Sequence, residues 1–271
     1  GVDFFLGYSP ERVNPGDKKR TIDKINKVIS GQNKKVETIL FDIYSKLTEG
    51  EIFLAKNIKV AEASKVIENA QRDINIAFIN EVAKICSKLN ISIYDVLDAS
   101  NTKWNFLPFL PGLVGGHCIG VDPYYLSHKA KELRVDPEVI LSGRRTNDNM
   151  TKFIFKEIQK RLKKKANILF LGVTFKEDVP DLRNSKAIEL LSFFQQPKFD
   201  VLINDPFIND DAYIKYKDLI EKSFDAIILT VPHTFYKEKF LHIKKLLKKD
   251  GILFDIKGIF RNKNMKNYWS L

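Results

Sequence analysis

One glycine-rich loop combines residue types that could support nucleophilic chemistry. The stretch PGLVGGHCIGVDPYY, residues 111–125, contains Cys118, which is one of only two cysteines in the chain. Asp122 followed by Pro123 predicts a helix start, because aspartate caps a helix and proline suits its first position. Cys118 would then lie just ahead of a helix N-terminus, which favours the reactive thiolate. The loop therefore indicates a cysteine nucleophile; the alternative is a tight turn with an incidental thiol.

The neighbours of Cys118 refine this hypothesis. Gly115 and Gly116 carry no side chains, so a ligand could approach the backbone there. His117 adjoins the cysteine, but adjacent side chains generally point apart, and a Cys–His dyad is not expected. His128 completes no recognisable zinc spacing with Cys118 and His117, so no metal site is predicted.

Other polar residues could assist a nucleophile. Lys65 and Asn69 are four residues apart and share one face of a predicted helix. A cation and an amide directed at one point could stabilise an oxyanion, although an exposed polar helix face would look the same. Glu11 follows a predicted strand, and Lys176 follows another, where it could meet a phosphate. By themselves, both are equally compatible with solvated surface residues.

The elements that must position these residues indicate an α/β protein with three domains. Residues 1–57 are expected to be the tail of an N-terminal Rossmann domain, with strands in DFFLGYSP and EIFLAKN flanking a helix in KKVETILFDIYSKL. Residues 58–150 are expected to form a central helical domain that carries the cysteine loop. Residues 151–271 alternate strands and helices, which predicts a doubly wound parallel sheet of the Rossmann-like type.

The central domain should contain one long helix from Lys59 to Leu89. Apolar residues at three- or four-residue spacing predict a buried stripe along it: Ile67, Ala70, Ile74, Phe78, Val82, Ile85 and Leu89. Cys86 adjoins the stripe and is predicted to be a core residue. A helix of this length commonly links domains or forms a dimer seam, so a homodimer is predicted.

Several polar residues follow predicted strands of the last domain, where ligands of doubly wound sheets bind. These residues are Thr174–Lys176, Asp205, Thr230 and Lys257. No GxGxxG motif occurs, and LGVTFKED stands where that motif would be expected, so the usual dinucleotide signature is missing.

Composition excludes some functions. The net charge of +11 suits an anionic substrate or nucleic acid. The basic runs at 160–165 and 244–250 contain no aromatic residues, which favours solvated helix ends over a nucleic-acid surface. No apolar run approaches the roughly 18 residues of a membrane span, so no membrane partner is predicted. Two cysteines cannot form a disulfide framework and favour a reducing, cytoplasmic location.

Four blocks of the sequence resemble, in order, those of the UDP-glucose/GDP-mannose 6-dehydrogenase family. They are YSPERVNPGD, KVAEASKVIENAQRDINIAFINE, TKWNFLPFLPGLVGGHCIGVDPYYL and GVTFKEDVPDLRNS. The Gly-Gly-His-Cys block, with Asp122 four residues after the cysteine, is highly specific. Within the family, the chain is most similar to bacterial UDP-N-acetylhexosamine 6-dehydrogenases, including UDP-N-acetylgalactosamine enzymes of the Vi antigen type.

The resemblance implies an NAD-dependent oxidation of a UDP-N-acetylhexosamine at C6, through the aldehyde to the uronic acid, for surface polysaccharide synthesis. It implies that Cys118 forms a thiohemiacetal and then a thioester. Lys65 and Asn69 match residues that stabilise the oxyanion, and Asp122 one that positions water or accepts protons. Glu11 matches the general base of thioester hydrolysis.

The resemblance also implies binding residues. Arg183 matches a residue near the cofactor phosphates. Lys257 stands where some members have arginine, and lysine cannot reproduce a bidentate fork. The residues matched to substrate contacts are Arg12, Val13, Asn14, Gly115, Phe175, Lys176 and Lys257.

The largest departure from the family is its N-terminal NAD-binding domain, of which only the last segment is expected here. The fragment alone is therefore expected to be inactive. Two alternatives remain at this stage. One is a different sugar nucleotide as substrate, namely UDP-glucose, UDP-N-acetylmannosamine or GDP-mannose, and the other is a non-catalytic sugar-nucleotide-binding fragment.

Overall fold

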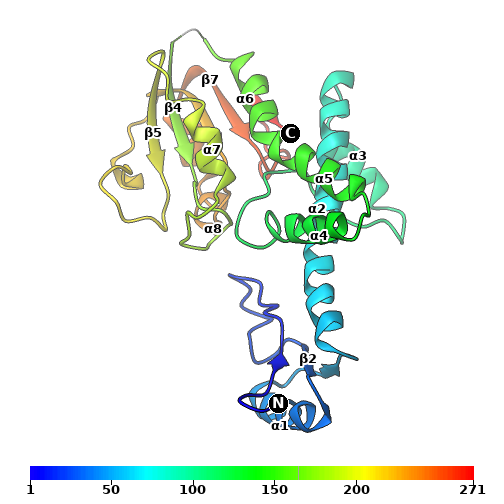
Figure 1. Cartoon of the computed structure of the whole chain (residues 1–271). Coiled ribbons are helices and arrows are strands. Elements are labelled where there is room, and N and C mark those ends of the chain that lie inside the picture. The colour runs from blue at the N-terminus through cyan, green and yellow to red at the C-terminus, as the bar shows by residue number, and fades with distance from the viewer. Residues whose placement is uncertain (164) are drawn as a thin grey trace. The chain divides into compact units, whose positions relative to one another are not determined.

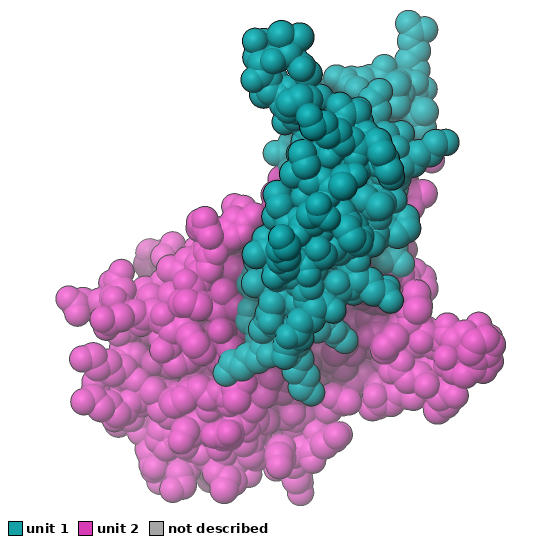
Figure 2. All heavy atoms as spheres, turned by 90° about the horizontal axis from the view of Figure 1, so that it is seen from below, with its two compact units in different colours: residues 1–71, 122–136 teal, residues 72–121, 137–271 magenta. Residues whose placement is uncertain are grey.

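The chain folds into two compact units in a computed structural model that describes residues 1–163 and 165–271. Unit 1 comprises residues 1–71 and 122–136, and unit 2 comprises residues 72–121 and 137–271 (Figure 2). Lys164, part of one predicted basic run, lies outside the described residues. The three domain boundaries expected from the sequence stay a prediction.

Unit 1 contains a small mixed sheet of order β1-β2-β3, in which β1 is antiparallel and β3 parallel to β2. The helix α1 has the predicted bounds, because the Asn33 side chain accepts a hydrogen bond from the Val36 amide and caps it. The buried strand β2 was not predicted. The elements are β1 (Gly7–Tyr8), β2 (Lys27–Gly31), α1 (Lys34–Leu47), β3 (Ile52–Leu54) and α4 (Asp122–Glu132).

The long helix α2 (Ile58–Leu89) confirms the predicted helix but not its predicted buried face. Four members of the expected stripe are more than half exposed: Ile67 (54%), Phe78 (62%), Ile85 (52%) and Leu89 (63%). The buried side chains are mostly small or polar: Ala70, Asp73, Ala77, Asn80, Ala83 and Cys86. The prediction of the buried face is wrong because hydrophobic spacing does not determine burial in this helix. Small residues and hydrogen-bonded polar residues form most of its buried face. Cys86 is a core residue, as predicted.

Unit 2 confirms the doubly wound α/β prediction. Its sheet has the order β5-β4-β6-β7-β8, and every pair of neighbouring strands is parallel. The elements, labelled in Figure 1 where space allows, are α3 (Ile93–Ser100), α5 (Glu138–Asp148), α6 (Met150–Gln159), β4 (Ala166–Leu171), α7 (Lys186–Ser192), β5 (Phe199–Asn204), η1 (Tyr216–Asp218), β6 (Phe224–Leu229), α8 (Thr234–Lys237), α9 (Phe240–Leu246), β7 (Leu247–Asp255) and β8 (Tyr268–Ser270).

Alternate residues of the central strands face two hydrophobic cores. Ile168 and Phe170 of β4 belong to a core shared with α2, α3, α6 and α7. Leu169 and Leu171 belong to a second core with α8 and α9. All four are fully buried, and each such side chain stabilises the fold by about 1.5–3 kcal/mol relative to exposure. Burial on both faces explains why β4 is a continuous apolar run rather than an alternating one.

The strand order locates the switch point of the sheet. The chain leaves β4 for β5 on one side and returns to β6 on the other, so connections diverge at the carboxyl ends of β4 and β6. Gly172 directly follows β4 there, with a φ of +81°. A Cβ on Gly172 would lie 2.2 Å from the Val231 carbonyl oxygen. Only glycine fits between the two strand ends.

We expect Gly172→Ala to destabilise the chain by about 2–4 kcal/mol, because it combines a left-handed backbone with a backbone clash. The matched control is Gly120→Ala, whose Cβ would meet nothing closer than 3.7 Å and should change stability by less than about 0.5 kcal/mol. Urea-induced unfolding measures both variants. Equal midpoints for the wild type and Gly172→Ala would contradict this account.

Candidate functional site

The cysteine loop is fixed at its base by a side chain of α2. Asn80 Nδ2 donates to the Gly112 carbonyl at 2.9 Å, and the Gly112 amide donates to Asn80 Oδ1 at 2.8 Å. Asn80 Nδ2 also donates to Asn147 Oδ1, and Asn147 Nδ2 donates to the Asp73 carbonyl. Asn80, Asn147 and Asp73 are all buried. Leaving any of these groups unpaired would cost about 1–3 kcal/mol, so the loop has one strongly preferred anchor.

The middle of the loop packs against the segment that follows β4. The Gly116 amide donates to the Asn184 carbonyl at 3.2 Å. A Cβ on Gly115 would lie 2.5 Å from that same oxygen. Gly116 has a φ of +87°, and a Cβ there would lie 2.9 Å from the Phe175 ring. The two glycines therefore allow a close backbone approach, and the surface approached is protein.

His117 turns toward the same segment. Its Nε2 atom lies 3.5 Å from Asp181 Oδ2, and its ring stands edge-on to Phe175 with centroids 5.9 Å apart. Cys118 is a free, exposed cysteine. The thiol is thus presented at the surface of a loop that glycine packing and the imidazole hold in place.

Arg183 and Asp181 form an exposed ion pair beside His117. Arg183 Nη2 lies 2.8 Å from Asp181 Oδ2, and Arg183 Nε donates to Asp181 Oδ1 at 3.0 Å. Hydrogen bonds from Arg183, with a smaller contribution from His117, lower the pKa of Asp181 to about 2. A cofactor phosphate at Arg183 would have to share the guanidinium with this carboxylate.

Lys257 follows the last long strand and crosses the base of the cysteine loop. Its Nζ atom would lie 3.1 Å from a Cβ placed on Gly112. Burial lowers the pKa of the half-buried Lys257, with Glu177 opposing and Lys237 adding to the shift. Within the described part of the chain, no hydrogen bond or ion pair engages Lys257. An anionic ligand would supply the missing counter-charge.

Unit 1 brings together two other expected site residues. Asn69 Nδ2 donates to Asp122 Oδ2, and Asn69 is largely buried. Lys65 is half-buried one helical turn before Asn69. The pKa of Tyr8 is raised, first by burial and then by the carboxylates of Glu62 and Asp122. Tyr8 was not predicted as a site residue, and its position beside the Glu11 turn was the only signal for it.

The turn around Glu11 is also held to α2 within unit 1. Arg12 Nη2 lies 2.9 Å from Glu68 Oε1, and Arg12 Nη1 donates to the Asn26 carbonyl at 3.1 Å. Glu11 Oε1 accepts from the Val13 amide at 2.6 Å. Glu68 precedes Asn69, so the Arg12 ion pair connects this turn to the part of α2 that carries Asn69.

A buried histidine at the switch point was missed by sequence analysis. His233 is fully buried, and its Nε2 atom lies 3.1 Å from Asp205 Oδ2 and 3.3 Å from Thr174 Oγ1. Thr174 and Asp205 were both expected near strand ends, and the structure brings them together around His233. The available signal was the position of His233 shortly after the end of strand β6, directly following Val231 and Pro232.

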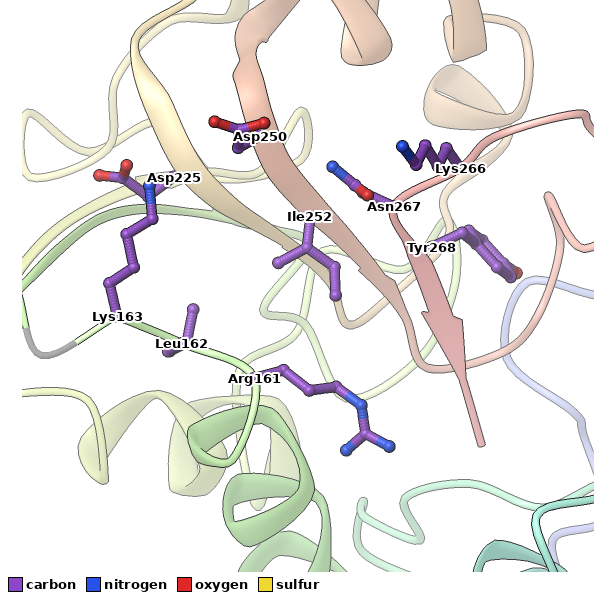
Figure 3. A pocket seen from close by; sticks show the side chains of 9 residues that line it. All are labelled: Arg161, Leu162, Lys163, Asp225, Asp250, Ile252, Lys266, Asn267 and Tyr268. Atoms are coloured by element: carbon purple, nitrogen blue, oxygen red, sulfur yellow. The ribbon is translucent and has the colours of Figure 1, made fainter.

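A cavity at the other end of the sheet is not part of this site. A cavity of about 460 Å³ opens at the amino ends of the parallel strands (Figure 3). Ligands of such sheets bind at the opposite, carboxyl ends, so this cavity is not the candidate site. Its lining residues are Arg161, Leu162, Lys163, Asp225, Asp250, Ile252, Lys266, Asn267 and Tyr268.

Two kinds of feature are absent from residues 1–163 and 165–271. No group of three or more His, Cys, Asp or Glu side chains there could hold a metal ion. No described helix has both the length and the apolar character needed to span a bilayer.

Comparisons with protein families match both parts of this architecture. Residues 59–149 match the central domain of the UDP-glucose/GDP-mannose dehydrogenase family. Residues 169–262 match the UDP binding domain of that family. The matched ranges contain Cys118, Asn80, Phe175 and Lys257.

Individual relatives agree with the family models. Protein CapL of Staphylococcus aureus is 50% identical over 274 residues, which cover 97% of this chain and 65% of CapL. A UDP-N-acetyl-D-glucosamine 6-dehydrogenase of Pseudomonas aeruginosa is 44% identical over 268 residues, covering 94% of this chain and 64% of the relative. The chain thus spans just under two thirds of the length of these relatives.

A solved structure shows the same fold. The UDP-D-ManNAc dehydrogenase from Pyrococcus horikoshii superimposes with a TM-score of 0.87 at 27% identity, covering all of this chain and 65% of the other. Since residues 59–149 and 169–262 match its central and UDP binding domains, the chain belongs to the UDP-glucose/GDP-mannose dehydrogenase family.

Proposed function

We propose that the protein containing this chain oxidises the C6 alcohol of a UDP-N-acetylhexosamine to the uronic acid, with NAD+ as oxidant and surface polysaccharide synthesis as its role. The observation that carries the proposal is the free, exposed Cys118 on a glycine loop packed against Phe175. The names of its relatives support the substrate class, since two at 44% and 43% identity are UDP-N-acetyl-D-glucosamine 6-dehydrogenases.

Cys118 would be the nucleophile of the second half of the reaction. Oxidation of the alcohol gives an aldehyde, and the Cys118 thiolate adds to its carbonyl carbon to form a thiohemiacetal. Oxidation of that adduct gives a thioester, which water cleaves to the acid while the thiol is regenerated. Covalent attachment splits a difficult oxidation into easier steps and retains the aldehyde.

Four residues of unit 1 would handle the proton and charge changes. Lys65 and Asn69 would stabilise the oxyanion of the tetrahedral adducts. Asp122, hydrogen-bonded to Asn69, would position water or accept a proton. Glu11 would act as general base in thioester hydrolysis once it releases the Val13 amide.

Residues of unit 2, together with the 12–14 turn, would bind the UDP-sugar. Lys257 supplies a cation without a protein partner in the described chain, which suits a diphosphate. Phe175 and Lys176 follow Gly172 at the switch point of the sheet, and Gly115 is in the loop beside them. The backbone of Arg12, Val13 and Asn14 would lie along the sugar nucleotide.

NAD+ fits the described residues only in part. When bound, it would accept a hydride from C6 in each oxidation. Arg183 is exposed and could face a cofactor phosphate, but it is already paired with Asp181. The sequence contains no GxGxxG loop, and the chain spans 65% of CapL. We therefore expect this chain alone to bind UDP-sugars without turnover.

The exposed apolar residues of α2 support the proposed homodimer. Ile67, Phe78, Ile85 and Leu89 are spaced by eleven, seven and four residues, which places them on one helix face. That face is distinct from the buried one that contains Asp73, Ala77 and Asn80. A second copy of the helix would remove this stripe from water.

Substitution of Cys118 tests its proposed role as the nucleophile. In a full-length protein with a cofactor domain, Cys118→Ser should abolish uronic acid formation from UDP-N-acetylhexosamine and NAD+, because serine forms no thioester intermediate. Mass spectrometry of the products measures this. Cys86→Ser is the matched control, since Cys86 is a buried core residue, and it should retain activity in its folded fraction.

Acid formation at the normal rate by Cys118→Ser would remove the thiol from the mechanism. UDP-sugar binding without any NADH formation by the full-length wild type would instead favour the non-catalytic binding fragment. Relative rates on UDP-N-acetylglucosamine, UDP-N-acetylgalactosamine, UDP-N-acetylmannosamine, UDP-glucose and GDP-mannose identify the substrate.

A charge placed in the apolar stripe of α2 tests the proposed homodimer. Phe78→Glu should convert a dimer to a monomer in sedimentation velocity, because a charge in the apolar seam loses its hydration. Arg72→Glu also places a glutamate on α2, at an exposed position away from the stripe, and should leave the dimer intact. A monomeric wild type at high concentration would exclude the proposed seam.

A further inference from the structure

His233 is a fully buried titratable group at the carboxyl end of the sheet that the proposed mechanism does not use. It has no exposed surface, and it lies between the end of β6 and the first residue of α8. Its ring packs against Phe207, with centroids 4.9 Å apart, and against Tyr236, with centroids 5.7 Å apart. The imidazole is therefore held in one orientation by aromatic rings.

The hydrogen bonds of His233 define its tautomer. The Asp178 amide donates to His233 Nδ1 at 2.9 Å, so Nδ1 is unprotonated. Nε2 lies 3.1 Å from Asp205 Oδ2 and must carry the proton that bridges them. Burial would raise the pKa of Asp205, but the hydrogen bond from His233, with further hydrogen bonds from the amides of Val173 and Phe207, lowers it overall. The pair is thus a neutral imidazole donating to a carboxylate.

Both partners of the pair hold the same segment. Asp205 Oδ2 also accepts from the amides of Val173, at 2.7 Å, and Thr174, at 3.2 Å. At the other end of the segment, the Asp178 amide donates to His233 Nδ1 at 2.9 Å. The Asp178 carboxylate also accepts from the Thr234 amide at 2.9 Å. Residues 173–178, which carry Phe175 and Lys176, are consequently attached at both ends to a single histidine–aspartate pair.

We propose that His233 is a positioning residue that fixes the conformation of residues 173–178 for UDP-sugar binding. The proposal rests on the proposed function of this site. His233 touches no substrate; it acts through Phe175, whose ring contacts the glycine loop, and through Lys176. When the neutral ring carries its proton on Nε2, Nδ1 can accept the hydrogen bond from the Asp178 amide.

Protonation of His233 would reverse the bond at Nδ1. A protonated Nδ1 cannot face the Asp178 amide, so the backbone must move away. The nearest replacement acceptor is Asp178 Oδ1 at 3.6 Å. The titratable groups that face the ring are Asp205 at the end of β5, Asp178 in the segment itself and Tyr236 on α8. Lys237 on α8 is paired with Glu177 at 3.0 Å.

The experiment uses the chain as it stands, without NAD+. Calorimetry measures UDP affinity at pH 8, and hydrogen exchange measures the amides of residues 173–178. His233→Ala should bind UDP about tenfold more weakly than the wild type, because the backbone groups that His233 and Asp205 hold lose one net hydrogen bond. Faster exchange should be confined to residues 173–178.

Conservative variants separate positioning from folding. His233→Asn keeps an acceptor near the Nδ1 position, so it should recover part of the affinity and part of the exchange protection that His233→Ala loses. The control is His242→Gln, since His242 is a half-buried histidine of the same unit that lies 2.9 Å from Tyr216 Oη instead. It should keep the wild-type affinity and the wild-type exchange at residues 173–178.

The outcomes are distinguishable. If the wild type does not bind UDP, the proposed function fails, and the exchange data still decide whether His233 orders residues 173–178. Unchanged exchange in His233→Ala, or no gain in affinity or protection from His233→Ala to His233→Asn, overturns the positioning role. If both variants misfold, the wild-type imidazole ¹⁵N shifts identify the tautomer. A ring that carries its proton on Nδ1 contradicts the proposal.

Discussion

The paired hydrogen bonds between Asn80 and Gly112 are the constraint on which the cysteine loop depends. They join a side chain to both polar groups of one backbone unit, as a neighbouring strand would, and so fix position and orientation together. Loop residues beyond Gly112 have no regular secondary structure to hold them. A preorganised reactive thiol requires such external support, because an unanchored loop would sample many positions.

The anchor itself rests on buried polar groups, and this choice has an energetic cost. Arg144 forms ion pairs with the buried Asp73 and with Asp148, and Asn147 connects Asp73 to Asn80. Burial raises the pKa of Asp73, and Arg144 and Asn147 offset only part of this shift. An apolar contact of the same size would stabilise the fold at least as well. Hydrogen bonds, unlike apolar contacts, specify direction, which a loop lacking its own structure needs.

The sequence was informative where local chemistry decides the structure. Apolar spacing predicts helix α1, Asp122 followed by Pro123 predicts α4, and strands alternating with helices predict the parallel sheet. It was uninformative where a residue's role depends on a distant partner. Asn80 and Gly112 are 32 positions apart, and His233 and Asp178 are 55 apart. Neither separation leaves a periodic pattern.

Helix α2 illustrates a second limit. Its apolar spacing correctly predicted a helix, but periodicity identifies an apolar face without saying what covers it. Phe78 and Ile85 are exposed, while Asp73 and Asn80 are buried. The apolar pattern therefore identified an exposed face of the helix rather than its buried face. The buried face of α2 in unit 2 is the one that carries Asp73 and Asn80.

The charges around the loop show why an anion is the fitting ligand. Arg183 is neutralised by Asp181, Lys186 by Asp148 and Glu189, and Lys237 by Glu177. Lys257 differs from these three cations, since no described residue accepts a hydrogen bond from it or forms an ion pair with it. Burial lowers the pKa of Lys257, and the charge of Glu177 only opposes this shift. A diphosphate offers a counter-charge and several acceptors at once, and a lysine can approach it without the planar geometry that an arginine would demand.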